Sequence, residues 1–489
     1  MKDAAGIDRM LDICALENHT VRRCLENGDI TLDAFLDIQA GKVQANCGVE
    51  PLRSPDDVKN RAAWMTEALT GRDAAGEVAD ALTKNAVCTA DHHGAIFCAQ
   101  SFQGDILYSL LLRKLGYGGK HVPVFCASQV ELENGAYARG ICVHNDPREK
   151  RLMPIFSAKY SVTLASHADP VDEEMTGRFR KRFIDAPDPR DNKDAAHLKK
   201  ALDVILRCSY ESGEAKKCDR FADQVTVAGV AISGHLFAGD DGPVFVYLEN
   251  EEVIKPALYE ELKDESSIIS RILYDDKTRS LFVNMKAEDG VSFGGLLFRS
   301  ADEKGRKILL TLTGDGKLTG TDWRREQVVY DTEPDTLIGL MEERKIIPGT
   351  FTCALISFFE RGITWFGGMF QSGYLPVWQK ELAGFLRRAG MTKEADVTEA
   401  YDCSGYISGP MFDIYRGRDF STVAGPVEYV LKRRAYGKLA GDMRRITLMD
   451  AHRIGLSEMY FDLVARDMRE DNWYEIIARE LGNLYPNES

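Results

Sequence analysis

The chain has 489 residues and a formal net charge of -14, and 44% of its residues are hydrophobic. This length predicts two or three domains, because single hydrophobic cores stop growing at roughly 250 to 300 residues, and the negative charge excludes nucleic-acid backbones and anionic membrane surfaces as partners. The first residues do not resemble a signal or transit peptide, no apolar run reaches the roughly 18 residues of a membrane span, and the eleven cysteines form no C-x-x-C pair, so we expect a cytoplasmic protein with reduced thiols.

The predicted elements, in chain order, divide the sequence into four parts. Residues 1–84 form an N-terminal helical segment, because apolar residues recur there at helical spacing. Residues 85–223 form a Rossmann-like α/β core, and residues 224–330 form a β-rich module in which "VTVAGVAISGHLF" and "RSLFVNMKA" are expected strands. Residues 331–489 form a helical region that completes the core. The predicted fold class is therefore α/β, with a parallel or mixed sheet, a β-rich middle module and helical segments at both ends.

A βαβ unit begins the predicted core. "AVCTA" starts a short strand at Ala86, an amphipathic helix runs from about Ser101 to Leu115, and "HVPVFCAS" is a second buried strand. Strands joined in this way are parallel and have a right-handed crossover. Ligands of such sheets bind outside the carboxyl ends of the strands, near the N-termini of the following helices. The loop of residues 89–94 therefore lies at the predicted site.

That loop contains the string Asp91-His92-His93-Gly94. We expect His92 and His93 to stabilise developing charge or to move a proton, and Asp91 to orient one of them. The structural alternative is that Asp91 caps the helix and the histidines pack against their neighbours.

A metal site at this loop is a further alternative, because imidazole and carboxylate suit Zn, Mn or Fe. The string resembles that of the DHH phosphoesterases, but no upstream Asp-x-Asp element precedes it. Adjacent side chains of an extended segment also point apart, so a single ion would reach only one histidine. A complete site would need further ligands, for which the candidates are Cys98, His121, Cys126, His144 and His167.

Other polar residues are expected to converge on the same edge. Glu131, in the loop after the second strand, is a candidate general base or metal ligand, and Arg139 is a candidate clamp for a carboxylate or phosphate. In "FGGMFQSGYLP" the glycine pair predicts either close approach to a ligand or a tight turn between helices. The predicted substrate-binding residues are Thr89, Gly94, Ser128, Asn134, Arg139 and Gln371. A solvated loop is the alternative for those that follow the second strand.

Several segments resemble the cysteine-adding ligase family of bacillithiol synthesis. They are "VCTADHHGAIF", "GDILYSLLLRKLG", "VPVFCAS" and "IIPGTFTCALISFFERGITWFGGMFQSGYLPVWQ". The resemblance implies a Rossmann-like core and a ligation reaction. The sequence departs from the family where Ala90-Asp91-His92-His93 replaces a Thr-Gly-Gln-Gln turn, and where a β-rich segment replaces a coiled-coil module.

Together these features predict an enzyme that acts on a small polar or anionic metabolite by group transfer or ligation, amide-forming or nucleotidyl-type. A metal-dependent hydrolase or lyase that uses Asp91, His92 and His93 is the first alternative, and a non-catalytic sensor of a small ligand is the second. Both a nucleotide and a divalent metal stay open as cofactors. The expected partner is a small molecule, with neither nucleic acid nor membrane, and a homo-oligomer stays open.

Overall fold

A five-stranded parallel sheet, in the order β13-β12-β1-β2-β5, lies at the centre of the protein. Its strands are β1 (Ala86–Cys88), β2 (His121–Cys126), β5 (Val244–Glu249), β12 (Thr364–Gly368) and β13 (Tyr406–Ser408). The computed structural model describes residues 6–94, 97–134, 139–144, 151–187, 193–286, 290, 292–417, 421–432 and 434–484. The predicted α/β fold class is confirmed, and every pairing of this sheet is parallel.

The strand order reverses direction beside β1. From β1 the chain moves outward through β2 to β5, and it later returns to the opposite side of β1 with β12 and then β13. The point between β1 and β12 is therefore a topological switch point, where two neighbouring crossovers leave the sheet in opposite directions. In open α/β sheets the ligand crevice lies at this point, outside the carboxyl ends of the strands.

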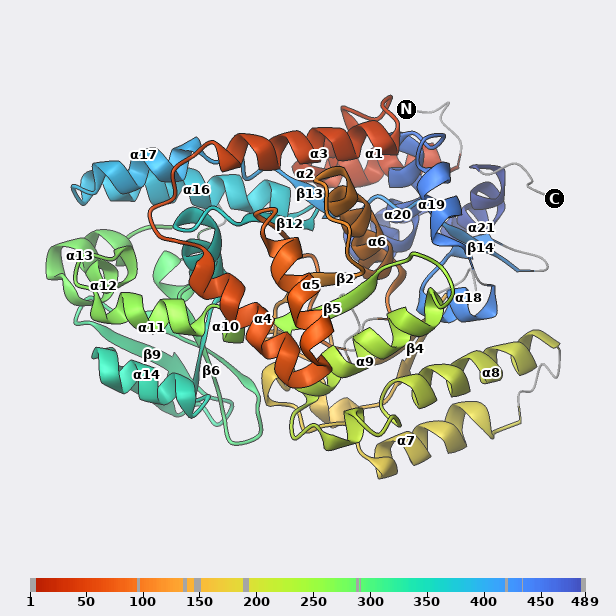
Figure 1. Cartoon of the computed structure of the whole chain (residues 1–489), viewed down its shortest axis with the longest axis horizontal. Helices are drawn as coiled ribbons and strands as arrows, with labels where there is room; N and C mark the ends of the chain where they lie inside the picture. Colours follow the sequence, from red (N-terminus) through yellow and green to blue (C-terminus); the bar gives the residue numbers. More distant parts are fainter. Residues whose placement is uncertain are drawn as a thin grey trace.

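Side chains of the strands alternate between two hydrophobic cores. Cys88, Val124 and Tyr247 belong to one core, whereas Val87 and Phe125 belong to the other. This alternation is the period of two that a strand covered on both faces requires. The first core includes α6 (Ala99–Lys114) and α9 (Phe221–Leu236), and the second includes α4 (Asp56–Thr70) and α5 (Arg72–Leu82), which are drawn in orange beside β2 and β5 in Figure 1.

The first and last helices of the chain pack together. The N-terminal helices are α1 (Ile7–Glu17), α2 (His19–Leu25) and α3 (Leu32–Cys47), and the C-terminal ones are α20 (Leu448–Leu463) and α21 (Trp473–Leu484). Backbone hydrogen bonds join the two ends, from Leu32 N to Ile446 O at 2.8 Å and from Leu448 N to Ile30 O at 2.7 Å. Figure 1 shows α1 next to α20 as a consequence.

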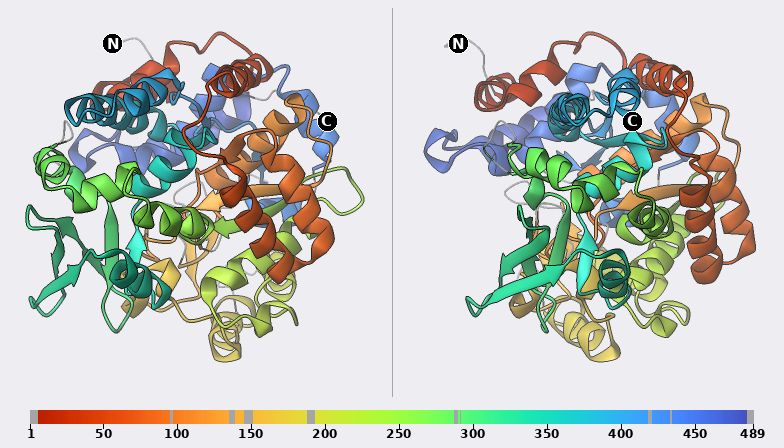
Figure 2. Two further views of the ribbon diagram at one scale, coloured as in Figure 1. Left: turned by 60° about the vertical axis from the view of Figure 1, so that its left-hand side comes forward. Right: turned by 90° about the vertical axis from the view of Figure 1, so that its left-hand side faces the viewer.

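Two small antiparallel sheets form the β-rich middle part. One contains β8 (Thr311–Leu312), β9 (Lys317–Thr321) and β10 (Gln327–Asp331), and the other contains β6 (Phe298–Ala301), β7 (Lys307–Leu309) and β11 (Ile346–Pro348). In Figure 2 these green to teal strands gather on one side of the molecule.

The prediction of strands at "VTVAGVAISGHLF" and "RSLFVNMKA" was wrong. Residues 225–236 of the first lie in α9, and residues 279–283 of the second lie in α13 (Asp276–Val283); Ala287 is outside the described residues. Their β-branched and aromatic residues favour strands by propensity, but tertiary packing overrides this preference. Gly229 shows how, because a Cβ there would lie 2.3 Å from the ring of Tyr247. The glycine lets α9 pack closely against β5, and that contact stabilises the helix.

The helical C-terminal region also contains strands that the sequence did not indicate. β12 spans five residues between helical segments, and β13 spans three. The other elements of the chain are α7 (Glu173–Phe179), α8 (Lys193–Cys208), α10 (Asn250–Val253), α11 (Lys255–Lys263), α12 (Ile268–Tyr274), α14 (Pro334–Glu342), α15 (Thr350–Ala354), α16 (Gln371–Arg388), α17 (Thr392–Ala400), α18 (Pro426–Leu431), α19 (Tyr436–Asp442), β3 (Gly140–Val143), β4 (Arg151–Pro154), β14 (Ile414–Arg416) and β15 (Ser421–Val423). None of the helices within the described ranges combines the length and apolar character that a membrane span requires.

Candidate functional site

The Asp91-His92-His93-Gly94 loop lies at the carboxyl end of β1, as the sequence predicted. It runs beside the end of β2, where His92 forms an isolated parallel bridge with Ala127. The backbone N–H of His93 donates to the carbonyl of Ala127 at 2.7 Å, and the N–H of Ala127 donates to the carbonyl of Asp91 at 3.0 Å. These bonds extend the sheet by two residues and fix the direction of each side chain in the loop.

The two histidine side chains point to different partners. Nδ1 of His92 lies 2.8 Å from Oδ1 of Asn134, in the loop after β2. Nε2 of His93 lies 2.7 Å from the carbonyl oxygen of Ala222 in α9, and because a carbonyl only accepts, this nitrogen carries the proton. Burial lowers the pKa of His93, so this ring is neutral at neutral pH. His93 therefore joins the loop to α9, and only the half-buried His92 faces the predicted substrate-binding loop.

Asp91 points into the protein. Its carboxylate is buried beside the side chains of Asp105 and Ser101, and no hydrogen bond joins it to either histidine within the described part of the chain. The structure therefore does not bring the Asp91 carboxylate into a hydrogen bond with the histidine that it was expected to orient. It is not the helix cap of the alternative either, because Cys98 occupies the N-cap of α6.

A cluster of acidic and thiol groups surrounds Asp91 instead. Burial raises the pKa of Asp91, and burial and the neighbouring Asp91 raise that of Asp105. Tyr247 Oη donates to Asp105 at 2.8 Å. Ligand atoms of Cys88, Asp91 and Asp105 all lie within 4.8 Å of one another. We name these three residues the acid cluster, and their ligand atoms are close enough together to hold one cation.

A second polar cluster lies at the carboxyl ends of β2 and β5. The hydroxyl of Ser128 lies 2.7 Å from Glu249 and 2.8 Å from Glu251, and its backbone N–H lies 3.0 Å from Glu251. Arg220 and Arg344 form ion pairs with Glu249. Burial would raise the pKa of Glu249, but the two arginines outweigh it and lower that pKa. We name this group, Ser128, Glu249, Glu251, Arg220 and Arg344, the carboxylate cluster.

Glu251 keeps its proton to neutral pH. Burial, together with the charge of Glu249, raises its pKa from 4.5 to about 7. A group whose pKa is close to the working pH can both take up and release a proton, which a general base must do. Glu251 thus has the chemistry that was predicted for Glu131.

Replacing Glu251 with glutamine is expected to flatten the pH dependence of stability. Because its pKa is higher in the folded chain than its ordinary value of 4.5, its contribution is fully present below that value and is lost as the pH rises through 7. Between pH 5 and 8, the free energy of unfolding of the variant should rise relative to that of the wild type by up to about 3 kcal/mol. Urea unfolding across this range measures the difference. The exposed Glu303→Gln is the control, and a difference that stays constant with pH would contradict the assignment.

Glu131 and Arg139, the predicted base and substrate clamp, contact other residues than those of the carboxylate cluster. Glu131 pairs with Lys307 of β7 at 2.5 Å. Arg139 pairs with Glu133 at 2.7 Å and donates to the carbonyl of Phe156 at 3.0 Å. Both side chains hold the loop after β2 against its neighbours, so neither is brought to the carboxylate cluster.

At the switch point, the predicted residues Thr89 and Gln371 meet. Thr89 Oγ1 donates to Gln371 Oε1 at 3.1 Å. Gln371 is buried at the start of α16, and its Nε2 has no hydrogen-bond partner among the described residues. A Cβ at Gly367 would lie 2.1 Å from Gln371 Oε1, so the glycine at the end of β12 makes room for this side chain. The glycine pair thus ends a strand and does not form a turn between helices.

Sequence reasoning missed Glu249, Glu251, Asp105, Arg220 and Arg344. The acids of "LENEE" follow a buried strand directly, and that position is a recognisable signal. Asp105 is an acid in the almost entirely buried helix α6, which is a second signal. Nothing local distinguishes Arg220 or Arg344 from solvated arginines.

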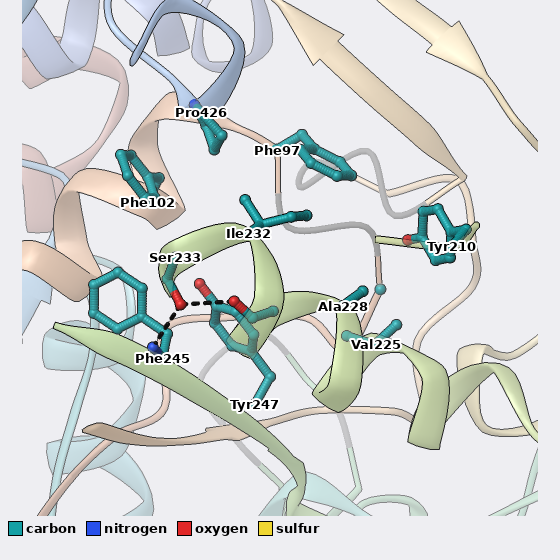
Figure 3. Close-up of a pocket in the computed structure, with 12 residues that line it drawn as sticks. Phe97, Phe102, Tyr210, Val225, Ala228, Ile232, Ser233, Phe245, Tyr247 and Pro426 are labelled. Carbon is teal, nitrogen blue, oxygen red and sulfur yellow. Dashed lines mark hydrogen bonds between the residues drawn. The ribbon is translucent and has the colours of Figure 1, made fainter. Parts of the chain in front are cut away.

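A small apolar cavity lies beside Gly94 and encloses about 20 Å³. Figure 3 shows Phe97, Phe102, Tyr210 and Tyr247 around it, with Ser233 donating toward the backbone. This volume suits about one water molecule. The cavity is therefore too small to hold a metabolite, and we place the candidate site at the carboxylate cluster and the switch point.

No protein-family model matches the chain, and searches among curated proteins and among solved structures found no match. The candidate site therefore rests on the geometry of this chain alone.

Proposed function

We propose that this chain is an enzyme that acts on a small polar or anionic metabolite by group transfer or ligation. The observation that carries the proposal is the carboxylate cluster, in which a buried acid with a pKa of about 7 touches a serine hydroxyl at the carboxyl ends of β2 and β5. Ionisable groups with perturbed pKa values gather at functional sites. Ligands of parallel sheets bind outside the carboxyl ends of the strands, which is where the carboxylate cluster lies.

In this proposal Glu251 is the general base, and Ser128 and Glu249 position it. The Ser128 hydroxyl lies within hydrogen-bond distance of both carboxylates. A substrate group that binds next to this hydroxyl, or in its place, could therefore exchange a proton with Glu251. Arg220 and Arg344 carry positive charge beside the same acids. They would balance the negative charge that develops when an acyl or phosphoryl group is transferred.

Thr89 and Gln371 would bind the substrate at the switch point. The buried Nε2 of Gln371 is a donor that lacks a partner within the described ranges, and an unmade hydrogen bond of this kind is costly unless a ligand or water satisfies it. His92 and Asn134 lie along the same edge. The resemblance to the cysteine-adding ligases favours ligation within this proposal, and ligation would require a nucleotide.

A ligand screen with a matched pair of variants tests the proposal. Adenosine and guanosine triphosphates, amino acids and phosphorylated sugars are added singly, and the melting temperature is measured. A ligand at about 100 times its Kd stabilises by about 2.7 kcal/mol. The stabilising compound should lose its effect on Gln371→Ala but keep it on Lys380→Ala, an exposed position of the same helix.

Two outcomes would contradict this proposal. Equal stabilisation of both variants would show that the ligand does not bind at the switch point. If no compound stabilised the protein, small polar or anionic metabolites would be excluded as its substrates. A stabilising ligand that is recovered unchanged with every co-substrate would favour a non-catalytic sensor.

Metal-dependent hydrolysis is a second candidate, favoured by the acid cluster of Cys88, Asp91 and Asp105. The ligand atoms of these three residues lie within 4.8 Å of one another, and a cation would offset the repulsion between two buried acids. If this candidate holds, added Mg²⁺ or Mn²⁺ should raise the melting temperature of the wild type by several degrees but not that of Asp91→Asn. Equal shifts in the two proteins would argue against it.

A further inference from the structure

Three potential metal ligands from distant segments converge away from the carboxylate cluster, and a fourth lies beside one of them. Cys98 precedes α6, Cys142 and His144 lie on and directly after β3, and Glu458 belongs to α20. Ligand atoms of Cys98, His144 and Glu458 lie within 4.8 Å of one another. Cys142 and His144 are two positions apart on an extended segment, so both side chains lie on one face.

Two spacings between these atoms are close to an edge of a tetrahedron around zinc, although Cys142 is not among the residues whose ligand atoms all lie within 4.8 Å of one another. Nε2 of His144 lies 3.7 Å from Sγ of Cys142, and Sγ of Cys98 lies 3.7 Å from Oε1 of Glu458. Zn–S and Zn–N bonds of about 2.3 and 2.0 Å at tetrahedral angles place such atoms roughly 3.5 Å apart. The contact from His144 Nε2 to Glu458 Oε1, at 2.8 Å, is shorter than these spacings and has the length of a direct hydrogen bond.

A second carboxylate orients the histidine in the way that metal sites require. Glu428 of α18 accepts the backbone N–H of His144 at 2.8 Å and lies 3.3 Å from its Nδ1. The N–H of Gly425 donates at 3.0 Å to Oε2 of Glu428, the oxygen that also faces Nδ1 of His144. With Nδ1 protonated toward Glu428, Nε2 is left as the metal-binding nitrogen. A carboxylate that holds the remote nitrogen is the usual partner of a zinc-bound histidine.

We infer that Cys98, His144 and Glu458 bind one zinc ion, and that Cys142, whose Sγ lies 3.7 Å from His144 Nε2, becomes the fourth ligand when its side chain turns toward the ion. The donor set of two thiolates, one imidazole and one carboxylate favours zinc over the hard cations calcium and magnesium. Four protein ligands close the coordination sphere, and the side chains of His144 and Glu458 are each only 2% exposed. The ion would therefore be structural, holding the β3–β4 hairpin against α6 and α20.

A cysteine nucleophile explains the same residues less well. Cys98, His144 and Glu428 have the order of a catalytic triad, but Glu458 lies between the thiol and the imidazole, and a second thiol lies at 3.7 Å from the same nitrogen. Cys98 is also buried. A nucleophile needs neither the extra carboxylate nor the extra thiol, whereas a metal ion uses both.

Metal analysis of protein purified without chelator tests the inference directly. Wild type should contain about one zinc per chain, and Cys142→Ser and His144→Ala should each lose most of it. Two controls should keep it: Cys218→Ser, at a half-buried cysteine outside the site, and Cys88→Ser, in the acid cluster. Loss of zinc in Cys88→Ser with retention in Cys142→Ser would overturn the assignment.

Cobalt spectroscopy of the wild type keeps the test decisive if the ligand variants do not fold. Protein produced with Co²⁺ should show the near-ultraviolet charge-transfer band of thiolate ligands and the intense visible bands of tetrahedral geometry. Absence of these bands, together with zinc in less than about a tenth of the chains, would overturn the inference. The result is independent of the ligand screen, because the zinc site and the carboxylate cluster share no residue.

Discussion

Replacing Arg361 with methionine is expected to destabilise the folded chain by about 3 to 5 kcal/mol. Arg361 precedes β12 and is buried, and it pairs with Asp57 of α4 at 2.8 Å and with Glu261 of α11. Glu360 lies 3.6 Å away. Burial and the neighbouring Glu261 raise the pKa of Glu360, so Glu261 is the buried carboxylate that loses its cation when Arg361 is removed. An uncompensated buried charge is the largest cost of breaking such a pair. Urea unfolding followed by circular dichroism measures the loss.

Arg387→Met is the matched control. Arg387 also pairs with two acids, Asp396 and Glu399, but its side chain is 41% exposed. Exposed ion pairs contribute about 0 to 1 kcal/mol because water screens them. Similar losses in the two variants would mean that burial does not govern the Arg361 network. Since this network lies at the amino end of β12, folded Arg361→Met should bind ligands at the switch point with unchanged affinity.

Gly455→Ala and Gly76→Ala are expected to change stability in opposite directions, although both glycines are inside helices. A Cβ at Gly455 would lie 1.8 Å from the carbonyl oxygen of Gly409. The backbone bond from Met411 to Ala451, at 2.9 Å, holds that segment against α20. The alanine must therefore push the segment after β13 away, at a cost of about 3 kcal/mol. Gly76 in α5 has no neighbour within 4 Å of the corresponding position, so alanine there should stabilise by about 1 kcal/mol.

Thermal unfolding of the two variants checks this pair of predictions. The melting temperature should fall in Gly455→Ala and rise in Gly76→Ala. A rise in both would show that α20 can move away from Gly409 at little cost. A fall in both would show that intrinsic helix propensity does not govern the exposed position in α5.

The fold could be predicted where its signals are local. The βαβ unit of β1, α6 and β2 is contained within about 40 residues, and its periodicity and loops identify it. β12 and β13 could not be found in this way, because they are short and their partners are far away in the sequence. In α9 the local signal was misleading, since residues such as Val225, Thr226 and Val227 favour strands until contact with β5 decides otherwise.

The sequence predicted the location of the candidate site better than it predicted which residues form it. The loop of Asp91 and His92 was expected at the carboxyl edge, and it lies there. The direction of each side chain depends on α9 and on the loop after β2, which periodicity does not place. Cys98 and His144 were named as candidate metal ligands for that loop, but they meet Glu458 from the far end of the chain instead. Ligands that are so far apart in the sequence form no motif of fixed spacing, so the sequence alone does not identify them as one site.

The return of the chain to the centre of the sheet sets the order in which the protein is assembled during translation. Residues 86–88 of β1 pair with residues 364–366 of β12, so one edge of the central strand stays open until residues 364–366 have left the ribosome. Chains are synthesised at about 5 to 20 residues per second, which leaves this apolar edge exposed for many seconds. An unpaired edge strand is a template for intermolecular pairing. Shielding of this edge therefore protects the nascent chain until β12 has been synthesised, and the switch point forms only after that.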